Sequence, residues 1–355
     1  MFAFGMKKFP LHISNIIHQP NDIVTFEFTS EIPVEYIPGQ FISIEIPINN
    51  RTVRRSYSLH SSPMLPEPLA ISVKRIDNGD VSRKLQDSYA IGDRVDAFGP
   101  NGLFTFEAAP NLARHLFLVG AGSGITPLFS ILKSALIAEP QSTITLIYSN
   151  RSIDSTLFYA ELQALKEQYP NQINIIYLWS TGKNLAMARL NRELLEKLVT
   201  QHLHVQKENA LLYLCGPADY MLMCTIALLT MGFTHEQLKK ETFVLPEDEA
   251  DDDDGTLQKE VEIDQTTYTV ILELNGLEHP VEVPYPISIL DAALQQKLDI
   301  PYSCKVGICG SCIATCIKGE VNMRYNEVLT DREVEHGRIL LCTCKPMEND
   351  VRIAL

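Results

Sequence analysis

Six of the eight cysteines lie in one short stretch of the chain, between residues 304 and 344. Four of them are separated by four, two and 29 residues: Cys304, Cys309, Cys312 and Cys342. This spacing is typical of the thiolate ligands of a 2Fe–2S iron–sulfur cluster. Gly307 and Gly310 lie between the ligands, where a residue without a side chain lets backbone amides turn toward sulfide. The cysteines therefore predict a centre that moves one electron at a time.

Two alternatives to a cluster stay open, a structural zinc site and buried thiols without a ligand. Clustered cysteines in a chain that shows no export signal point to metal rather than to disulfides. Zinc motifs prefer paired Cys-x2-Cys hooks, and only one such pair is present. Cys344 competes with Cys342 for the position of the fourth ligand. The apolar run before Cys342 places Cys342 at the end of a strand, and we therefore favour Cys342 as the ligand. Cys316 and Cys344 are predicted to be packing residues.

A Gly-rich turn could hold a pyrophosphate. Gly120, Gly122 and Gly124 occupy alternate positions after one predicted strand and before a predicted helix. This order directs backbone amides and the helix dipole at a phosphate. The alternate spacing differs from the usual Rossmann fingerprint, so the turn alone indicates a phosphate site of unspecified type.

The string RRSYS at residues 54–58 follows an apolar strand. Its Arg55 could bind phosphate, because a guanidinium fork matches phosphate oxygens. Taken alone, the string is also consistent with an ordinary exposed strand.

These residues need elements to position them, and the first hundred residues are predicted to be β-structure. Strands with β-branched residues or alternation cover residues 24–30, 41–48 and 69–76. A short helix is predicted at 81–86, with Asp80 or Ser82 near its start. We expect a six- to eight-stranded antiparallel barrel or sandwich.

From about residue 115, strands alternate with helices. The predicted strands cover 115–120, 143–149, 173–180 and 210–216, and the helices cover 127–138, 155–169, 192–203 and 220–232. Ser155 is expected to cap the second of these helices. The alternation implies right-handed crossovers and a parallel sheet with helices on both faces.

The stretch PEDEADDDDG at 246–255 repels itself and lacks apolar periodicity, so it predicts an extended linker. Two roles stay open for this linker, a plain spacer and a segment that steers a partner protein. After it we expect a hairpin over 268–274 and 281–285, a helix over 287–297 and a Cys-rich loop region. The predicted divisions are 1–110, 111–245, the acidic linker 246–262, and 263–355.

In this order the motifs resemble those of the ferredoxin–NADP reductase superfamily. Residues 263–355 resemble a plant-type 2Fe–2S ferredoxin, on the strings PYSCKVGICGSC and ILLCTCKP. The resemblance implies a multidomain fold: an antiparallel β-barrel that binds FAD, an α/β parallel-sheet domain that binds NAD(P)H, and a β-grasp ferredoxin domain. It assigns Arg55 to the FAD pyrophosphate, Tyr57 to the isoalloxazine and Ser58 to the flavin nitrogen that accepts hydride. The other positions that it assigns to FAD are Val73, Lys74, Gly79, Val81, Ser82 and Phe243.

The same resemblance assigns a second set of residues to the nicotinamide nucleotide: Gly120, Gly122, Gly124, Thr126, Pro127, Cys215, Gly216, Pro217 and Met221. Among them, Thr126 and Cys215 join Ser58 at the point of hydride transfer. Arg151 follows the second strand of the nucleotide domain, where an acidic residue would favour NADH and an arginine tolerates a 2′-phosphate. Arg151 therefore favours NADPH as the donor. NADH as the donor, with Arg151 a plain solvated loop charge, is the alternative.

The order of domains resembles the reductase components of bacterial multicomponent oxygenases, the phenylacetyl-CoA epoxidase reductases among them. It implies electron transfer from NAD(P)H through FAD to the 2Fe–2S cluster and on to an oxygenase, epoxidase or desaturase component. The alternatives are a diaphorase or hydride-transfer enzyme whose cluster is reduced by another donor, and a carrier that uses the ferredoxin domain alone.

The charge is uneven. The net charge is −14, of which residues 1–245 carry −1, residues 246–262 carry −8 and residues 263–355 carry −5. This excludes an ordinary nucleic-acid binder, which needs a basic face. It also predicts a basic docking surface on the acceptor. No run approaches the ~18 apolar residues of a membrane span, and we expect a cytoplasmic protein.

Overall fold

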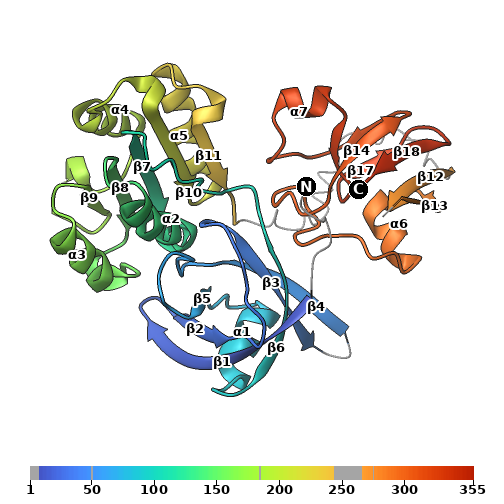
Figure 1. Ribbon diagram of the computed structural model, residues 1–355, viewed down its shortest axis with the longest axis horizontal. Coiled ribbons are helices and arrows are strands. Elements are labelled where there is room, and N and C mark those ends of the chain that lie inside the picture. The colour runs from blue at the N-terminus through green and yellow to red at the C-terminus, as the bar shows by residue number, and fades with distance from the viewer. Residues whose placement is uncertain (1–7, 49–50, 184, 244–265, 275) are drawn as a thin grey trace, which may run out of the picture. The chain divides into compact units, whose positions relative to one another are not determined.

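The structure is a computed structural model that describes residues 8–48, 51–183, 185–243, 266–274 and 276–355. The chain divides into two compact units, one over Lys8–Phe243 and the other after residue 243 (Figure 1). The acidic linker predicted at 246–262 lies outside the described residues. Within the described part, no helix is long and apolar enough to cross a membrane.

The first unit begins with a six-stranded antiparallel sheet in the order β4-β3-β6-β1-β2-β5. A bridge between Leu59 and Ile71 joins the chain after β4 to β5, so the sheet closes on itself as a barrel. Alternate residues of β3 fill the interior, with Ile42, Ile44 and Ile46 fully buried. The elements are β1 (Lys8–Gln19), β2 (Ile23–Thr29), β3 (Phe41–Ile48), β4 (Arg51–Ser58), β5 (Leu69–Lys74), α1 (Asp80–Ser88) and β6 (Arg94–Asn101).

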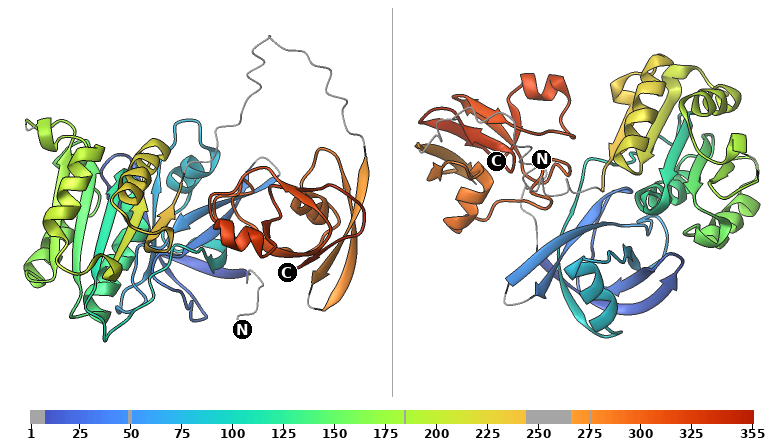
Figure 2. Two further views of the ribbon diagram at one scale, coloured as in Figure 1. Left: turned by 90° about the horizontal axis from the view of Figure 1, so that it is seen from above. Right: turned by 180° about the vertical axis from the view of Figure 1, so that it is seen from behind.

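The second half of this unit is a five-stranded parallel sheet in the order β11-β10-β7-β8-β9, with helices on both faces (Figure 2). Leu116 and Leu118 of β7 face the core that includes α2 and α3, whereas Phe117 and Val119 face the core that includes α4 and α5. The elements are β7 (His115–Ala121), α2 (Ile125–Ala138), β8 (Thr143–Asn150), α3 (Tyr159–Gln168), β9 (Ile173–Trp179), α4 (Arg192–His202), β10 (Ala210–Cys215), α5 (Ala218–Thr230) and β11 (Leu238–Glu241).

The predicted cap of α3 was wrong. Ser155 lies in a separate 3-10 turn, Ile153–Ser155, where its hydroxyl donates to the Ser152 carbonyl (2.9 Å). The helix starts later because Phe158 turns inward with a φ of 59° and stacks on Phe129 (4.5 Å between centroids). Burial of Phe158 therefore sets the start of this helix.

One core joins the barrel to the parallel sheet. Phe104 and Phe106, which follow β6, pack with α2 residues in the same buried cluster as Leu116 and Leu118. The hydroxyl of Tyr213 on β10 donates to the Thr105 carbonyl at this joint (3.2 Å). The segment that follows the barrel is thus packed on the face of the parallel sheet that α2 also covers.

The second unit contains a five-stranded mixed sheet, β13-β12-β18-β14-β16, in which β12 and β18 are parallel. Helix α6 packs on this sheet through Ile289, Leu290 and Ala293, which is the β-grasp arrangement. The elements are β12 (Thr267–Leu274), β13 (Leu277–Pro284), α6 (Ile289–Gln295), β14 (Ile313–Lys318), β15 (Val321–Met323), α7 (Asp331–Glu335), β16 (Arg338–Leu340), β17 (Cys344–Pro346) and β18 (Val351–Ala354).

Candidate redox site

The carboxyl edge of the parallel sheet collects three of the functional segments. Cys215, the last residue of β10, pairs in register with Gly120 of β7 on one side and with Glu241 of β11 on the other. Because parallel strands end at one edge, the Gly-rich turn, the cysteine and the last carboxylate of this unit lie at the same level. This edge is where ligands bind in open α/β sheets.

The Gly-rich turn leaves room for a ligand at one glycine and none at another. A Cβ on Gly124 would lie 2.3 Å from the Cys215 carbonyl oxygen, so this glycine allows the turn to approach β10. Gly122 has a φ of +55°, and a Cβ there would meet nothing within 4 Å. A 3-10 helical turn, Gly122–Gly124, leads into helix α2 at Ile125, and neither element has a side-chain cap. Open space beside uncapped helix amides fits a phosphate group.

The other residues that the sequence assigns to the nucleotide lie on α2 and between β10 and α5. Thr126 is buried, and its hydroxyl donates to the Ser123 carbonyl (3.0 Å). Pro127 is buried in the first turn of α2, and Met221 is buried on α5. Gly216 packs against Tyr220, and Pro217 precedes α5 as its N-cap residue.

Arg151 lies beyond these residues, exposed after the end of β8. Its position leaves the guanidinium accessible to a ligand.

A hydrogen bond connects the barrel to the carboxyl edge of the sheet. Ser58 Oγ, at the end of β4, donates to Glu241 Oε2 (3.0 Å), although the two residues are 183 positions apart. Burial raises the pKa of Glu241 from 4.5 to about 8, and the Ser58 bond opposes that rise. A carboxyl of this kind holds a proton at neutral pH. The sequence resemblance assigned a role to Phe243, two residues further on, but none to Glu241.

Cys215 lies beside this pair and is fully buried. Burial, together with the neighbouring Glu241, raises the pKa of the Cys215 thiol well above 9.0. It is therefore a neutral thiol that packs closely and does not act as a thiolate nucleophile.

The barrel presents the residues that the sequence assigns to FAD at its β4 and β5 edges and at α1. Arg55 is exposed and Tyr57 is half-buried. Val73 is buried on β5, and the next residue, Lys74, is exposed. Phe243 is 40% exposed after β11, which leaves one aromatic ring uncovered near the Ser58–Glu241 bond.

Helix α1 starts one residue earlier than predicted, at Asp80, with Gly79 as an N-cap residue that supplies no side-chain bond. Ser82 does not cap the helix, because its hydroxyl accepts from the Ile76 amide (3.0 Å) and donates to the Gly79 carbonyl (3.3 Å). Val81 is buried under the helix. The first amides of α1 are therefore left without a side-chain cap, which fits an anionic group.

The four predicted ligand cysteines of the second unit come together. The Cys304 thiol lies within hydrogen-bonding reach of Cys309 and Cys342, and Cys342 also reaches Cys312. The Val306 amide donates to Cys304 Sγ (3.4 Å). Four converging sulfurs with amides directed at them are the donor set of an iron–sulfur cluster.

The loop depends on Gly307, which has a φ of +82°. A Cβ on Gly307 would lie 2.8 Å from the Tyr325 carbonyl oxygen. Among the described residues, no three His, Cys, Asp or Glu side chains are placed to hold one metal ion. A two-iron cluster divides four thiolates between two irons, whereas structural zinc gathers four ligands at one point. The arrangement fits the two-iron cluster better.

The two flanking cysteines are placed differently. Cys344 is fully buried in the core of the second unit, as expected of a packing residue. Cys316 lies on β14, half-buried, with its sulfur 3.6 Å from the Lys318 carbonyl oxygen.

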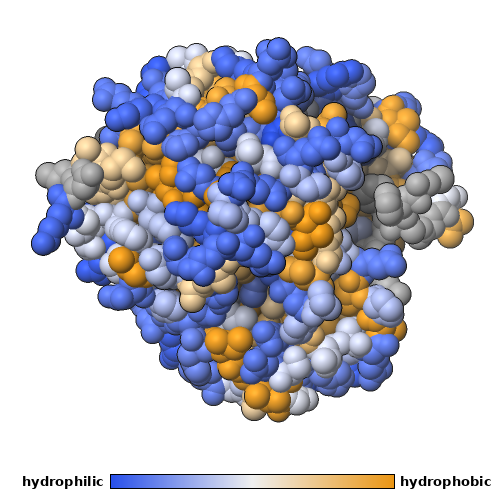
Figure 3. Space-filling view, turned by 60° about the vertical axis from the view of Figure 1, so that its left-hand side comes forward, coloured by the Kyte–Doolittle hydropathy of each residue, from blue (hydrophilic) through white to orange (hydrophobic). Residues whose placement is uncertain are grey.

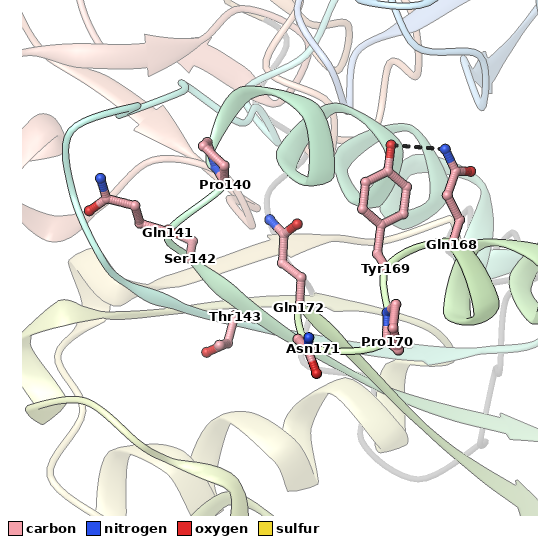
Figure 4. Close-up of a pocket in the computed structure, with 9 residues that line it drawn as sticks. All are labelled: Pro140, Gln141, Ser142, Thr143, Gln168, Tyr169, Pro170, Asn171 and Gln172. Atoms are coloured by element: carbon pink, nitrogen blue, oxygen red, sulfur yellow. Dashed lines mark hydrogen bonds between the residues drawn. The ribbon is translucent and has the colours of Figure 1, made fainter.

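A shallow polar hollow lies at the opposite edge of the parallel sheet (Figure 4). Its lining includes Thr143 at the start of β8 and Gln172 just before β9, and Gln172 Nε2 donates to the Glu139 carbonyl (2.7 Å). Because it lies at the amino ends of the strands, it is separate from the nucleotide edge. The face of the molecule in Figure 3 is largely hydrophilic, with separate apolar patches.

The sheets and sites together define a class of protein, a flavin- and nicotinamide-dependent reductase with its own iron–sulfur domain. Three family models match the chain: an oxidoreductase FAD-binding domain at residues 9–106, an oxidoreductase NAD-binding domain at 118–225 and a 2Fe-2S iron-sulfur cluster binding domain at 272–347. The predicted cofactors, FAD, NAD(P)H and a 2Fe–2S cluster, are thereby confirmed.

Relatives match along nearly the whole chain. The ferredoxin reductase component of 3-ketosteroid-9-alpha-monooxygenase from Rhodococcus rhodochrous is 33% identical over 98% of this chain and 97% of its own. One subunit of the 1,2-phenylacetyl-CoA epoxidase from Escherichia coli K12 is 29% identical over 96% of each chain. The structure of phthalate dioxygenase reductase superposes with a TM-score of 0.61 at 25% identity and 98% coverage of both chains. The chain belongs to the family of oxygenase ferredoxin reductase components.

Proposed function

We propose that this protein takes a hydride from NAD(P)H and delivers single electrons to an oxygenase-type component. The observation that carries the proposal is the Ser58–Glu241 bond, which fixes the rim of the flavin barrel to the carboxyl edge of the nucleotide sheet beside Cys215. Relatives that match nearly the full length are named as a ferredoxin reductase component of a ketosteroid monooxygenase, a subunit of a phenylacetyl-CoA epoxidase and a reductase subunit of a glycine betaine monooxygenase.

When bound, FAD accepts the hydride of NAD(P)H as an electron pair, and the 2Fe–2S cluster carries electrons singly. On the flavin side, Arg55 and the uncapped start of α1 bind the diphosphate, and Tyr57 and Phe243 cover the ring system. Val73 and Lys74 line the same surface, with Gly79, Val81 and Ser82 shaping the α1 turn. Ser58 and Glu241 hold a proton at the rim.

On the nucleotide side, Gly120, Gly122 and Gly124 bring the α2 amides to the pyrophosphate. Thr126 and Pro127 fix the start of α2. Cys215 packs at the nicotinamide as a neutral thiol. Gly216, Pro217 and Met221 line the bottom of the nicotinamide site. Arg151 binds a 2′-phosphate, which makes NADPH the preferred donor over NADH.

In the second unit, Cys304, Cys309, Cys312 and Cys342 ligate the cluster. The acceptor is an oxygenase, epoxidase or desaturase component with a basic docking surface, since 13 of the 14 net negative charges lie after residue 245. Its association should slow as salt rises. We place the reaction in the cytoplasm, where free thiols persist.

The test of this function is Cys309→Ser. The variant should retain FAD and NAD(P)H-dependent ferricyanide reduction but lose cytochrome c reduction by more than about tenfold, because only one-electron transfer through the cluster is cut. Cys316→Ser is the matched control, since it removes a cysteine outside the set of four, and it should keep both activities. Equal loss of both activities in Cys309→Ser, with FAD retained, would count against a linear route from flavin to cluster.

A further inference from the structure

Two tyrosines hold the carbonyl side of the Gly-rich turn. Tyr148 on β8 donates from its hydroxyl to the Gly122 carbonyl (3.0 Å). Tyr220, in the first turn of α5, donates to the Gly120 carbonyl (3.3 Å) and lies 3.3 Å from Ser149 Oγ. We refer to Tyr148 and Tyr220 as the tyrosine brace.

Both hydroxyls are in a state to donate. Burial raises the pKa of Tyr148 and of Tyr220, so each phenol keeps its proton. A phenol has one proton to give, and for Tyr148 the Gly122 carbonyl is nearer than the alternative Leu157 carbonyl (3.5 Å). For Tyr220, Ser149 can donate in return, which leaves the phenol proton for Gly120.

The two bonds act on the turn from different elements. Tyr148 comes from the neighbouring strand, and Tyr220 comes from the helix that follows Cys215-Gly216. The Tyr220 ring also packs on Gly216, where a Cβ would lie 3.1 Å from Cδ1. With its carbonyls held on the protein side, the turn keeps the open face of Gly122 toward the ligand.

We infer that the tyrosine brace sets the affinity for the pyrophosphate of NAD(P)H by fixing the amide face of the Gly-rich turn. The inference rests on the proposed nucleotide site and adds two positioning residues, neither of which needs to contact the nucleotide. Residues 148 and 220 carried no functional expectation from the sequence.

The experiment compares Tyr148→Phe and Tyr220→Phe with Tyr213→Phe in the full-length holoprotein. Tyr213 is a matched control, because it is also buried and its hydroxyl also donates to a backbone carbonyl, that of Thr105 (3.2 Å). The three variants should show similar small drops in melting temperature and normal FAD content.

The brace variants should raise KM and the dissociation constant for NADPH about fivefold each, the factor for one hydrogen bond of about 1 kcal/mol, with kcat unchanged. Tyr213→Phe should leave both constants within about twofold, since its bond lies away from the turn. With reduced nicotinamide mononucleotide, a donor without the pyrophosphate, all variants should match the wild type.

NADPH affinity in the brace variants equal to that of Tyr213→Phe would overturn the inference while leaving the proposed function intact. An equal loss with both donors would also overturn it. A wild-type protein that binds FAD but oxidises neither NADPH nor NADH would contradict the proposed function itself, and the inference with it.

Discussion

Replacing Glu241 with glutamine should change how the stability of the first unit depends on pH. Burial raises the pKa of Glu241 to about 8, from 4.5. The unfolded chain ionises this carboxyl above about pH 4.5 and the folded chain only above about pH 8. The contribution of Glu241 to stability is therefore fully present below the lower value and is lost as the pH rises toward the upper one. Glutamine does not titrate and avoids this loss.

The magnitude follows from the linkage relation. Stability falls by about 1.4 kcal/mol per pH unit, or about 3.4 kcal/mol between pH 5 and pH 7.5. Because Glu241 is only partly buried, solvent screening reduces this to about 1.7 kcal/mol. The melting temperature of Glu241→Gln relative to the wild type should therefore rise by roughly 3 to 7 °C between the two pH values.

Flavin release during heating of the holoprotein measures this difference. Glu208→Gln, which removes an exposed carboxylate of the same unit, is the control and should show no such trend. If Glu241→Gln and the wild type keep a constant difference in melting temperature across this pH range, Glu241 is not held protonated in the fold.

Two further predictions concern the nucleotide side. Gly124→Ala places a Cβ 2.3 Å from the Cys215 carbonyl oxygen, so NAD(P)H affinity should fall by about tenfold or more, at a steric cost of about 1–3 kcal/mol. Gly92→Ala has nothing within 4 Å of its Cβ but a φ of +96°, so it strains the backbone without a clash at β10 and should spare affinity. Equal titration curves for both variants would refute the close approach of the turn to β10. Arg151→Ala should raise KM for NADPH by about tenfold through loss of one charged hydrogen bond and leave KM for NADH unchanged. A parallel rise for both donors would show that Arg151 does not recognise the 2′-phosphate.

Most of the parallel-sheet half could be predicted from the sequence. Its strands are apolar runs and its helices are periodic, so β8, β9 and β10 lie within a residue of their expected bounds. RRSYS was consistent with an exposed strand, but the place of β4 beside β3 could not be predicted, because Val53 and Tyr57 are the only apolar residues of RTVRRSYS. The strand expected before Cys342 is present as β16, but the other strands after Cys312 were missed. Three of them, β15, β17 and β18, have only three or four residues and show no periodicity.

The candidate site also has a part that could be predicted from the sequence and a part that could not. Motifs with fixed spacing, such as the four cysteines and the Gly-rich turn, could be recognised because their chemistry is local. The bond from Ser58 to Glu241 could not, because it joins the end of β4 to the end of β11. The bonds of Tyr148 and Tyr220 to the Gly-rich turn are also long-range. The only signal in the sequence was the polar hydroxyl of Tyr148 near the end of the apolar run TITLIYS at residues 143–149.

The order of electron transfer is the central claim, and rapid mixing of the oxidised protein with NADPH under anaerobic conditions tests it most directly. Flavin absorbance and the electron paramagnetic resonance signal of the reduced cluster should be followed on the same samples. Loss of flavin absorbance should precede the cluster signal, and in Cys309→Ser it should occur without that signal. A cluster signal that develops at full rate in protein stripped of FAD would contradict the account.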